Sequence, residues 1–109
     1  MDTKLISGTV EMMILEVIGG EKSYGYEITQ RVLERSGKQL ELKEGSLYPA
    51  LHRLERQKLL TASWSEHEGR RRKYYRLTAK GRKTLAAKRT EWQSFASSVN
   101  SVLGIEGSK

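Results

Sequence analysis

A run of four basic side chains follows Gly69 and is the densest charge in the sequence: Arg70, Arg71, Arg72 and Lys73. Guanidinium and ammonium groups bind phosphate oxygens through charge-assisted hydrogen bonds, and such contacts supply affinity with little base preference. The run begins a longer basic stretch, because residues 70–90 contain ten Lys or Arg and no acidic residue. This patch predicts a polyanionic partner, while a solvated turn is the alternative for the run taken alone.

A second polar set recurs at helical spacing ahead of that patch. Four residues stand at i, i+3, i+4 and i+7 and therefore share one helix face: Pro49, His52, Arg53 and Arg56. Ser46 and Tyr48 also lie off the apolar side of the same helix. A helix fits the major groove of DNA, where arginine can form two hydrogen bonds with guanine. The alternative is that the two arginines form surface ion pairs with Glu44 or Glu55.

Catalytic chemistry finds little support in the residue types. The chain has no cysteine and one aspartate, and its two histidines, His52 and His67, fall in different predicted elements. No nucleophile–base pair and no metal-ligand spacing is visible. We therefore expect no enzymatic activity, no cofactor and no metal.

Apolar periodicity places the polar sets on predicted elements. Apolar residues at positions 10, 13, 14, 17 and 18 predict a helix that starts near Ser7 or Thr9 and ends at Gly19. A second helix is expected over residues 24–35. A third has its apolar face at positions 47, 50, 51 and 54, with Ser46 as its N-cap and Pro49 in its first turn.

Alternating patterns predict strands. Residues 39–43 are typical of a very short strand, and residues 60–64 and 73–77 alternate as a hairpin around a polar turn at 65–69. Trp64, Tyr74 and Tyr75 could stack on unpaired bases. We expect Trp64 and Tyr75 to pack in the core of the hairpin instead, because they alternate with leucines.

The last predicted helix runs from Ala79 to about Leu103, with Thr78 as its cap. Its apolar residues are spaced at sevens in two sets offset by three, with Lys88 interrupting the pattern: Leu85, Trp92 and Val99, then Phe95 and Val102. This stripe predicts a two-fold dimer interface, and the alternative is that the helix folds back on the first helix of its own chain. Trp92 and Phe95 could also line a pocket for a flat aromatic ligand, although core packing is the ordinary role of such residues.

Size and composition are those of one small folded domain. The chain has 109 residues and 12.4 kDa, with 37% hydrophobic and 30% charged residues and a net charge of +7. No apolar run is long enough for a membrane span and no signal peptide is visible, so we expect a cytoplasmic protein. The element order predicts an α+β, mainly helical fold: a winged helix-turn-helix with an added C-terminal dimerisation helix. We expect the DNA-binding domain at 1–78, the dimerisation helix at 79–104 and a disordered tail at 105–109.

Three strings of the sequence resemble the PadR family of bacterial transcriptional regulators: Ser23–Ile28, Glu44–Glu55 and Arg71–Gly81. The resemblance covers nearly the whole chain, and the single C-terminal helix matches the short class of the family. It implies a winged helix-turn-helix homodimer that binds an inverted-repeat operator, usually as a repressor. It also implies that the Tyr48-Pro49 segment opens the recognition helix and that small aromatic compounds release some members from DNA, with Trp92 and Phe95 as candidate ligand contacts.

The sequence therefore favours a sequence-specific DNA-binding regulator. Residues near the start of the third helix are expected to meet bases or nearby phosphates: Ser46, Tyr48, Pro49, His52, Arg53 and Arg56. The expected partners are double-stranded DNA, a second copy of the chain and a small aromatic effector, with no membrane. The alternative is an architectural or protein-interaction winged-helix module that does not read sequence.

Overall fold

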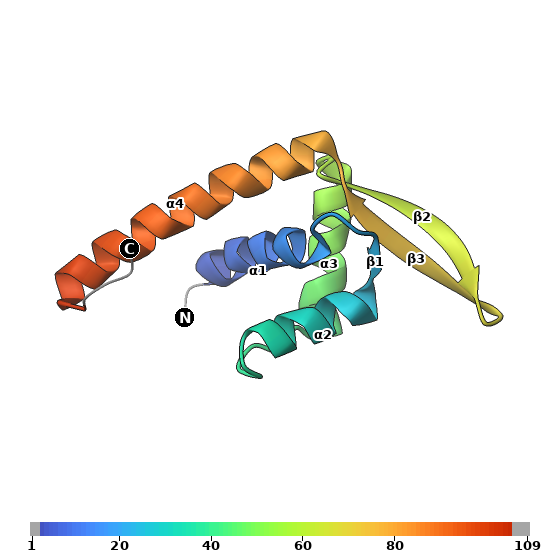
Figure 1. Cartoon of the computed structure of the whole chain (residues 1–109), viewed down its shortest axis with the longest axis horizontal. Helices are drawn as coiled ribbons and strands as arrows, with labels where there is room; N and C mark the ends of the chain where they lie inside the picture. The colour runs from blue at the N-terminus through green and yellow to red at the C-terminus, as the bar shows by residue number, and fades with distance from the viewer. Residues whose placement is uncertain (1–2, 106–109) are drawn as a thin grey trace.

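The computed structural model of the protein describes the backbone of residues 3–105 and the side chains of residues 8–105 (Figure 1). Its elements follow in the order α1 (Thr3–Ile18), β1 (Ser23–Tyr24), α2 (Gly25–Arg35), α3 (Glu44–Arg56), β2 (Leu60–His67), β3 (Arg70–Leu77) and α4 (Ala79–Leu103). The predicted mainly helical α+β winged-helix fold is confirmed. No helix within the described residues is long and apolar enough to cross a bilayer.

The core lies where α1, α2 and α3 meet the base of the sheet. Apolar residues at helical spacing on each helix turn inward, and Ile14, Ile28 and Leu51 are fully buried. Each such side chain contributes about 1.5–3 kcal/mol when it is removed from water. The hairpin adds residues only at its base, where Leu60 and Leu77 are buried. The core therefore fixes the buried, apolar face of α3.

Strands β2 and β3 form a long antiparallel hairpin, which we call the wing. Their register runs from Leu60 opposite Leu77 to His67 opposite Arg70. Glu68 and Gly69 form the two-residue turn, and both have positive φ, at 52° and 75°. Paired positive φ values suit the right-handed twist of a tight hairpin, and glycine adopts them without strain. The turn is thus shorter than the predicted polar turn at 65–69.

The prediction of a strand at residues 39–43 was wrong. These residues form a loop, and the third strand is β1, which pairs with β3 in the sheet order β1-β3-β2. Gly37 and Lys38 both have positive φ and turn the chain away from the sheet after α2. Ser23 and Tyr24 pair with β3 and so take the place of the third strand, which the sequence pattern had assigned to the segment before α3.

Two helices begin earlier than the sequence pattern predicts. Helix α1 starts at Thr3, so Ser7 and Thr9 lie within it and do not cap it. Helix α3 starts at Glu44, with Lys43 as N-cap, and the Lys43 carbonyl accepts from the amide of Ser46. The carboxylate of Glu44 suits the positive end of the helix dipole. Pro49 consequently lies in the second turn, where it leaves the exposed Gly45 carbonyl without an intrahelical donor.

Helix α4 is anchored at its start, as predicted from Thr78. The Thr78 hydroxyl accepts from the Gly81 amide at 2.9 Å and donates to the Lys58 carbonyl at 2.7 Å. A Cβ on Gly81 would collide with the Leu59 carbonyl, so only glycine allows this close approach. From there α4 passes along α1, and its far half points away from the wing along the 54 Å length of the molecule (Figure 1). The predicted tail lies outside the described residues, apart from Ile105.

Candidate nucleic-acid interface

Helix α3 turns one face inward and leaves the other free. Leu47, Ala50, Leu51 and Leu54 are buried, as their spacing predicts. Five of the six helix residues expected to meet DNA are exposed: Ser46, Tyr48, Pro49, His52 and Arg56. The structure thus brings these five predicted residues to one accessible side of a rigid helix.

Arg53 departs from that group. Its Nε lies 2.8 Å from Oε1 of Glu11, which is on α1 and largely buried. The partner is neither Glu44 nor Glu55, the two carboxylates that sequence proximity suggests. A charge-assisted hydrogen bond of this length stabilises the packing of α3 against α1.

A groove of about 460 Å³ separates α3 from the wing and the start of α2. We call it the wing groove. Aromatic and basic side chains line it, and none of its lining residues is acidic: Tyr24, Gly25, Tyr26, Tyr48, His52, Trp64, Arg71, Arg72, Lys73 and Tyr75. Such a lining suits an anionic ligand with flat or apolar parts.

Three consecutive basic residues of β3 are each held by a different element. The Arg71 guanidinium lies 4.8 Å from the ring centre of Trp64 on β2, and that of Arg72 lies 4.4 Å from the ring centre of Tyr24 on β1. Lys73 donates to Glu55 on α3 at 3.1 Å. A cation–π contact engages the π face of a ring, so N–H groups of the guanidinium remain available to donate to an anion. Three of the four residues of the basic run therefore each contact a defined partner.

Lys73 differs from the arginines because it is paired with a carboxylate. Burial alone lowers the pKa of the Lys73 ammonium, but the bond to Glu55 and the neighbouring Tyr75 hydroxyl outweigh burial, so the pKa is raised. Burial has the opposite effect on the Tyr75 phenol, whose pKa it raises because the charged form of tyrosine is the anion. Lys73 is charged at neutral pH, and Glu55 offsets much of that charge locally.

The prediction that Trp64 packs in the core was wrong, whereas the same prediction for Tyr75 was right. Tyr75 is 2% exposed and Trp64 is 58% exposed, although both side chains lie on one face of the wing. That face covers the core only near the base of the hairpin. Toward the tip of the hairpin, the same face of the wing extends beyond α3, and there Trp64 lines the wing groove.

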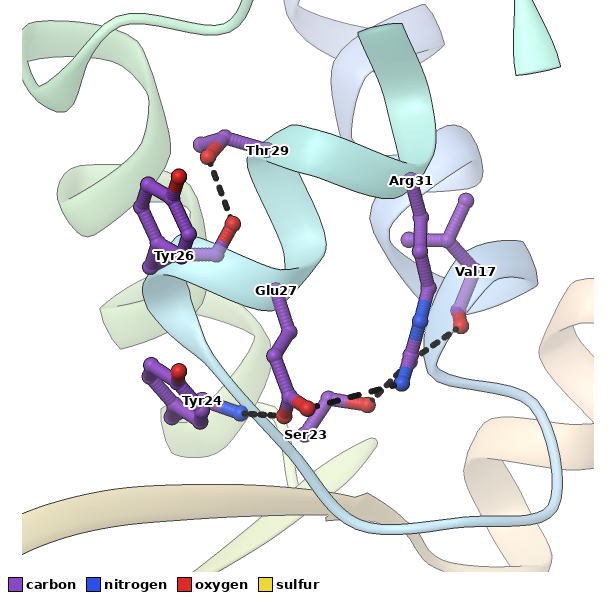
Figure 2. Close-up of polar contacts among 7 residues, drawn as sticks. All are labelled: Val17, Ser23, Tyr24, Tyr26, Glu27, Thr29 and Arg31. Carbon is purple, nitrogen blue, oxygen red and sulfur yellow. Dashed lines mark hydrogen bonds and ion pairs between the residues drawn. The ribbon is translucent and has the colours of Figure 1, made fainter. Parts of the chain in front are cut away.

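A network of polar contacts fixes Tyr24 at the edge of the groove (Figure 2). Its amide donates to Glu27 at 3.2 Å, and Glu27 in turn lies 3.9 Å from Arg31. Arg31 also donates to the Val17 carbonyl at 3.1 Å and to the hydroxyl of the fully buried Ser23. This network ties the end of α1 and the start of α2 together.

Gly25 explains how Tyr48 lies against α2. A Cβ at Gly25 would stand 2.8 Å from the Tyr48 hydroxyl, which is closer than van der Waals contact allows. The glycine therefore lets the phenol ring of Tyr48 on α3 pack directly on the backbone of α2. Sequence reasoning missed Tyr24, Tyr26 and Trp64 as groove residues, although the first two flank this glycine.

The far half of α4 carries exposed apolar side chains. Four of them, which we call the apolar stripe, recur at helical spacing: Trp92, Phe95, Val99 and Val102. Leu85, which was predicted to share their interface, instead packs against the core of its own chain. The near half of α4 contacts α1, where Arg89 bonds Glu16 at 2.6 Å. The alternative that the helix folds back on α1 is thus confirmed for the near half of α4, and the dimer interface stays a prediction for the far half.

Two hollows lie beside Trp92 where α4 passes α1. Each has a volume of about 340 Å³, and both are lined by Met12 as well as Trp92. Both have charged residues in their lining: Lys88 and Glu91 beside Phe95 in one, and Glu16, Arg35 and Arg89 in the other. Trp92 and Phe95 also form a tilted ring pair with centres 6.3 Å apart. The two residues predicted as ligand contacts thus lie together at a recessed surface.

Comparisons with known proteins agree with this architecture. The model of the transcriptional regulator PadR-like family matches residues 14–87. Transcriptional regulator Rv3488 of Mycobacterium tuberculosis is 36% identical over 90 residues, which cover 83% of this chain and 81% of that protein. The structure of a transcriptional regulator from Clostridium thermocellum matches with a TM-score of 0.83 at 33% identity, over 91% of this chain and 97% of the other.

A PadR family transcription regulator from Clostridium difficile R20291 matches with a TM-score of 0.76 and 36% identity, over 86% of this chain and 97% of that one. The matched family span runs from α1 into α4 and so includes α3, the wing and the groove between them. These relatives are regulators of transcription, not enzymes. On fold, matched span and identity together, the chain belongs to the PadR-like family of transcriptional regulators.

Proposed function

We propose that the protein is a homodimeric repressor that binds an inverted-repeat DNA operator. The observation that carries the proposal is the wing groove, a cationic and aromatic channel beside the free face of a rigid helix. In a winged helix, such a helix enters the major groove while the hairpin follows the adjacent backbone. The groove between them then receives the phosphates that separate the two DNA grooves.

Base contacts come from the exposed face of α3. Tyr48 and His52 line the wing groove, and Arg56 lies one turn beyond His52 at the same surface. Arginine there can form two bonds with guanine, and Ser46 and Pro49 lie near the helix start, where bases are closest. We assign Arg53 to holding α3 against Glu11 in the free protein, and Arg70–Lys73 to the phosphate backbone.

A second copy of the chain covers the apolar stripe of α4. Val102 is 87% exposed and Phe95 is 53% exposed, and a repeat of exposed apolar residues on a helix is typical of a helix–helix interface. A two-fold arrangement buries the same stripe on both chains and directs two copies of α3 to one side of a duplex. The half-sites then stand about one helical turn apart.

The hollows beside Trp92 are the site we propose for a small, flat aromatic effector in the cytoplasm. They are lined by Met12 and Trp92, whose side chains suit an apolar ring, and they adjoin the proposed dimer interface. A ligand that binds there in a different dimer arrangement would lower DNA affinity through its preference for that arrangement. Such release is the usual way in which a repressor responds to a compound.

Selection of bound duplexes from a random pool tests the main proposal. We expect the purified protein to enrich an inverted repeat at about physiological salt, with half-sites roughly one helical turn apart. Retention of duplex with no enriched motif would contradict sequence reading and indicate an architectural protein. Failure to retain any duplex, even at low salt, would contradict DNA binding itself.

A further inference from the structure

We propose that Trp64 is a positioning residue that presents the Arg71 guanidinium to a DNA phosphate in the wing groove. The inference rests on the proposed DNA binding and adds a role for a side chain that the fold does not require. It also divides the basic run of the wing into one presented arginine and three residues with other surroundings.

Trp64 has no place in the core. Its side chain is 58% exposed and lies on β2 beyond the point where the wing covers α3, yet it lines the groove. A single exposed aromatic residue is ordinary on a protein surface, so its role is indicated by the group that its ring contacts. The partner within the chain is Arg71, which lies diagonally across the hairpin on the same face, 4.8 Å from the ring centre.

The geometry of the Trp64–Arg71 pair leaves the guanidinium able to bind a phosphate. Guanidinium is planar, and its five N–H donors point outward in that plane. When one face rests on an indole ring, the donors remain available for two bonds to a phosphate. The ring also limits the rotamers of Arg71 before DNA arrives, so less side-chain entropy is lost on binding.

The other basic residues of the run are placed differently. Lys73 is bonded to Glu55, so part of its charge is already offset. Arg72 lies over Tyr24, on the opposite face of the strand from Arg71, and a hydrogen bond with the Tyr74 side chain raises its pKa. Arg70 is exposed beside the hairpin turn. Arg71 stands opposite Glu66 in the strand register, and its guanidinium lies over Trp64. Arg71 is therefore the arginine that lines the groove on the α3-facing side of the wing.

The test measures binding of one mixed-sequence duplex as a function of salt for Trp64→Ala, Trp64→Phe, Arg71→Ala and the double alanine variant. Ser63→Ala is the matched control, because Ser63 is exposed on the same strand but faces the other side. We expect Trp64→Ala to weaken binding by about 2- to 5-fold per wing, the effect of an exposed cation–π contact. The salt dependence should stay that of the wild type, since no charge is lost.

The remaining variants test whether Trp64 acts by positioning Arg71 or by its own contact with DNA. Trp64→Phe retains a ring and should bind within about 2-fold of wild type. Arg71→Ala should weaken binding and lower the salt slope by about one per wing. The double variant should match Arg71→Ala alone, because the indole has nothing left to position.

Fluorescence gives a second measurement. In a Trp92→Phe background Trp64 is the one remaining tryptophan, and its emission should change when duplex is added.

Three outcomes overturn the inference while leaving DNA binding intact. These are wild-type affinity in Trp64→Ala, additive effects in the double variant, and a salt slope that falls with Trp64→Ala as it does with Arg71→Ala. Equal melting temperatures for Trp64→Ala and Ser63→Ala would show that the fold is intact in both. If the wild type binds no duplex at low salt, the proposed function itself fails and this inference fails with it.

Discussion

The wing groove and the far half of α4 both expose aromatic side chains, but the neighbouring side chains differ between the two surfaces. In the groove, Trp64 and Tyr24 each lie under a guanidinium group. On α4, Trp92 and Phe95 contact each other, and the apolar stripe continues beyond them to Val102. The two surfaces also lie toward opposite ends of the molecule (Figure 1).

The difference shows what each surface lacks. Cations stacked on rings form a surface that is prepared for an anion and needs no further apolar cover. An apolar stripe without cations is unfavourable in water until another apolar surface covers it. The cations and rings of the wing groove are therefore complete within one chain, whereas the apolar stripe still needs a second surface to cover it.

Charging the apolar stripe should have the largest effect on this comparison. With Val99→Glu and Val102→Glu together, we expect a monomer of 12.4 kDa, because four carboxylates would face one another across the two-fold axis. Operator affinity should fall by about 100-fold or more, since the two half-sites are no longer bound together. Light scattering and operator titration measure both effects.

Ser97→Glu is the control for charge on α4. Ser97 is exposed on the opposite face of the helix from the stripe, so this variant should remain dimeric and bind normally. A dimeric Val99→Glu, Val102→Glu protein would mean that the stripe is not the interface.

Gly25→Ala should disturb the wing groove from within. The new methyl group would lie 2.8 Å from the Tyr48 hydroxyl, so the phenol or the helices must shift, at about 1–3 kcal/mol of stability. We expect a lower melting temperature and weaker duplex binding. Adding Tyr48→Phe removes the closest atom and should restore much of the stability.

Gly45→Ala is the matched control, because no atom lies within 4 Å of the position that its Cβ would take. If Gly25→Ala melts like Gly45→Ala, the close packing of Tyr48 on α2 has no energetic consequence.

Arg56→Ala should distinguish base contacts from phosphate contacts. We expect it to weaken the operator complex by about 1–3 kcal/mol and to weaken binding of random duplex much less. Arg71→Ala should weaken both duplexes similarly, since its partner is the backbone. Parallel titrations with the selected operator and a scrambled duplex measure the ratio. An equal loss for both variants on both duplexes would contradict this division between α3 and the wing.

Glu55→Gln should have the smallest effect, and it should be a gain. The substitution frees Lys73 from its ion pair and removes a negative charge beside the wing groove. Duplex binding should strengthen by about 0.5–1 kcal/mol at low salt, and the gain should shrink as salt is raised. Glu34→Gln, at an exposed position of α2 that does not line the groove, is a control for loss of one carboxylate. Unchanged affinity would mean that Lys73 does not reach the DNA.

Sequence patterns predicted the helices well and their starts less well. Buried faces follow from a 3.6-residue period, which is a local property, so Ile14, Ile28 and Leu51 were expected inside. Helix starts depend on competing caps, and the Lys43 carbonyl together with Glu44 prevailed over Ser46. The third strand was misplaced because pairing depends on which segment reaches β3, and no local pattern contains that information.

By itself, the sequence determined the wing, the free face of α3, the basic run and the apolar stripe, because charge and periodicity are written along the chain. Only the tertiary structure decided which neighbours these residues meet. It placed Arg53 on Glu11, Lys73 on Glu55 and Arg71 on Trp64, across up to 42 positions of sequence. The physical reason is that a contact between two residues depends on distances set by packing of the whole core. The preference of a residue for burial or exposure, in contrast, depends on its own side chain and can be recognised in the sequence.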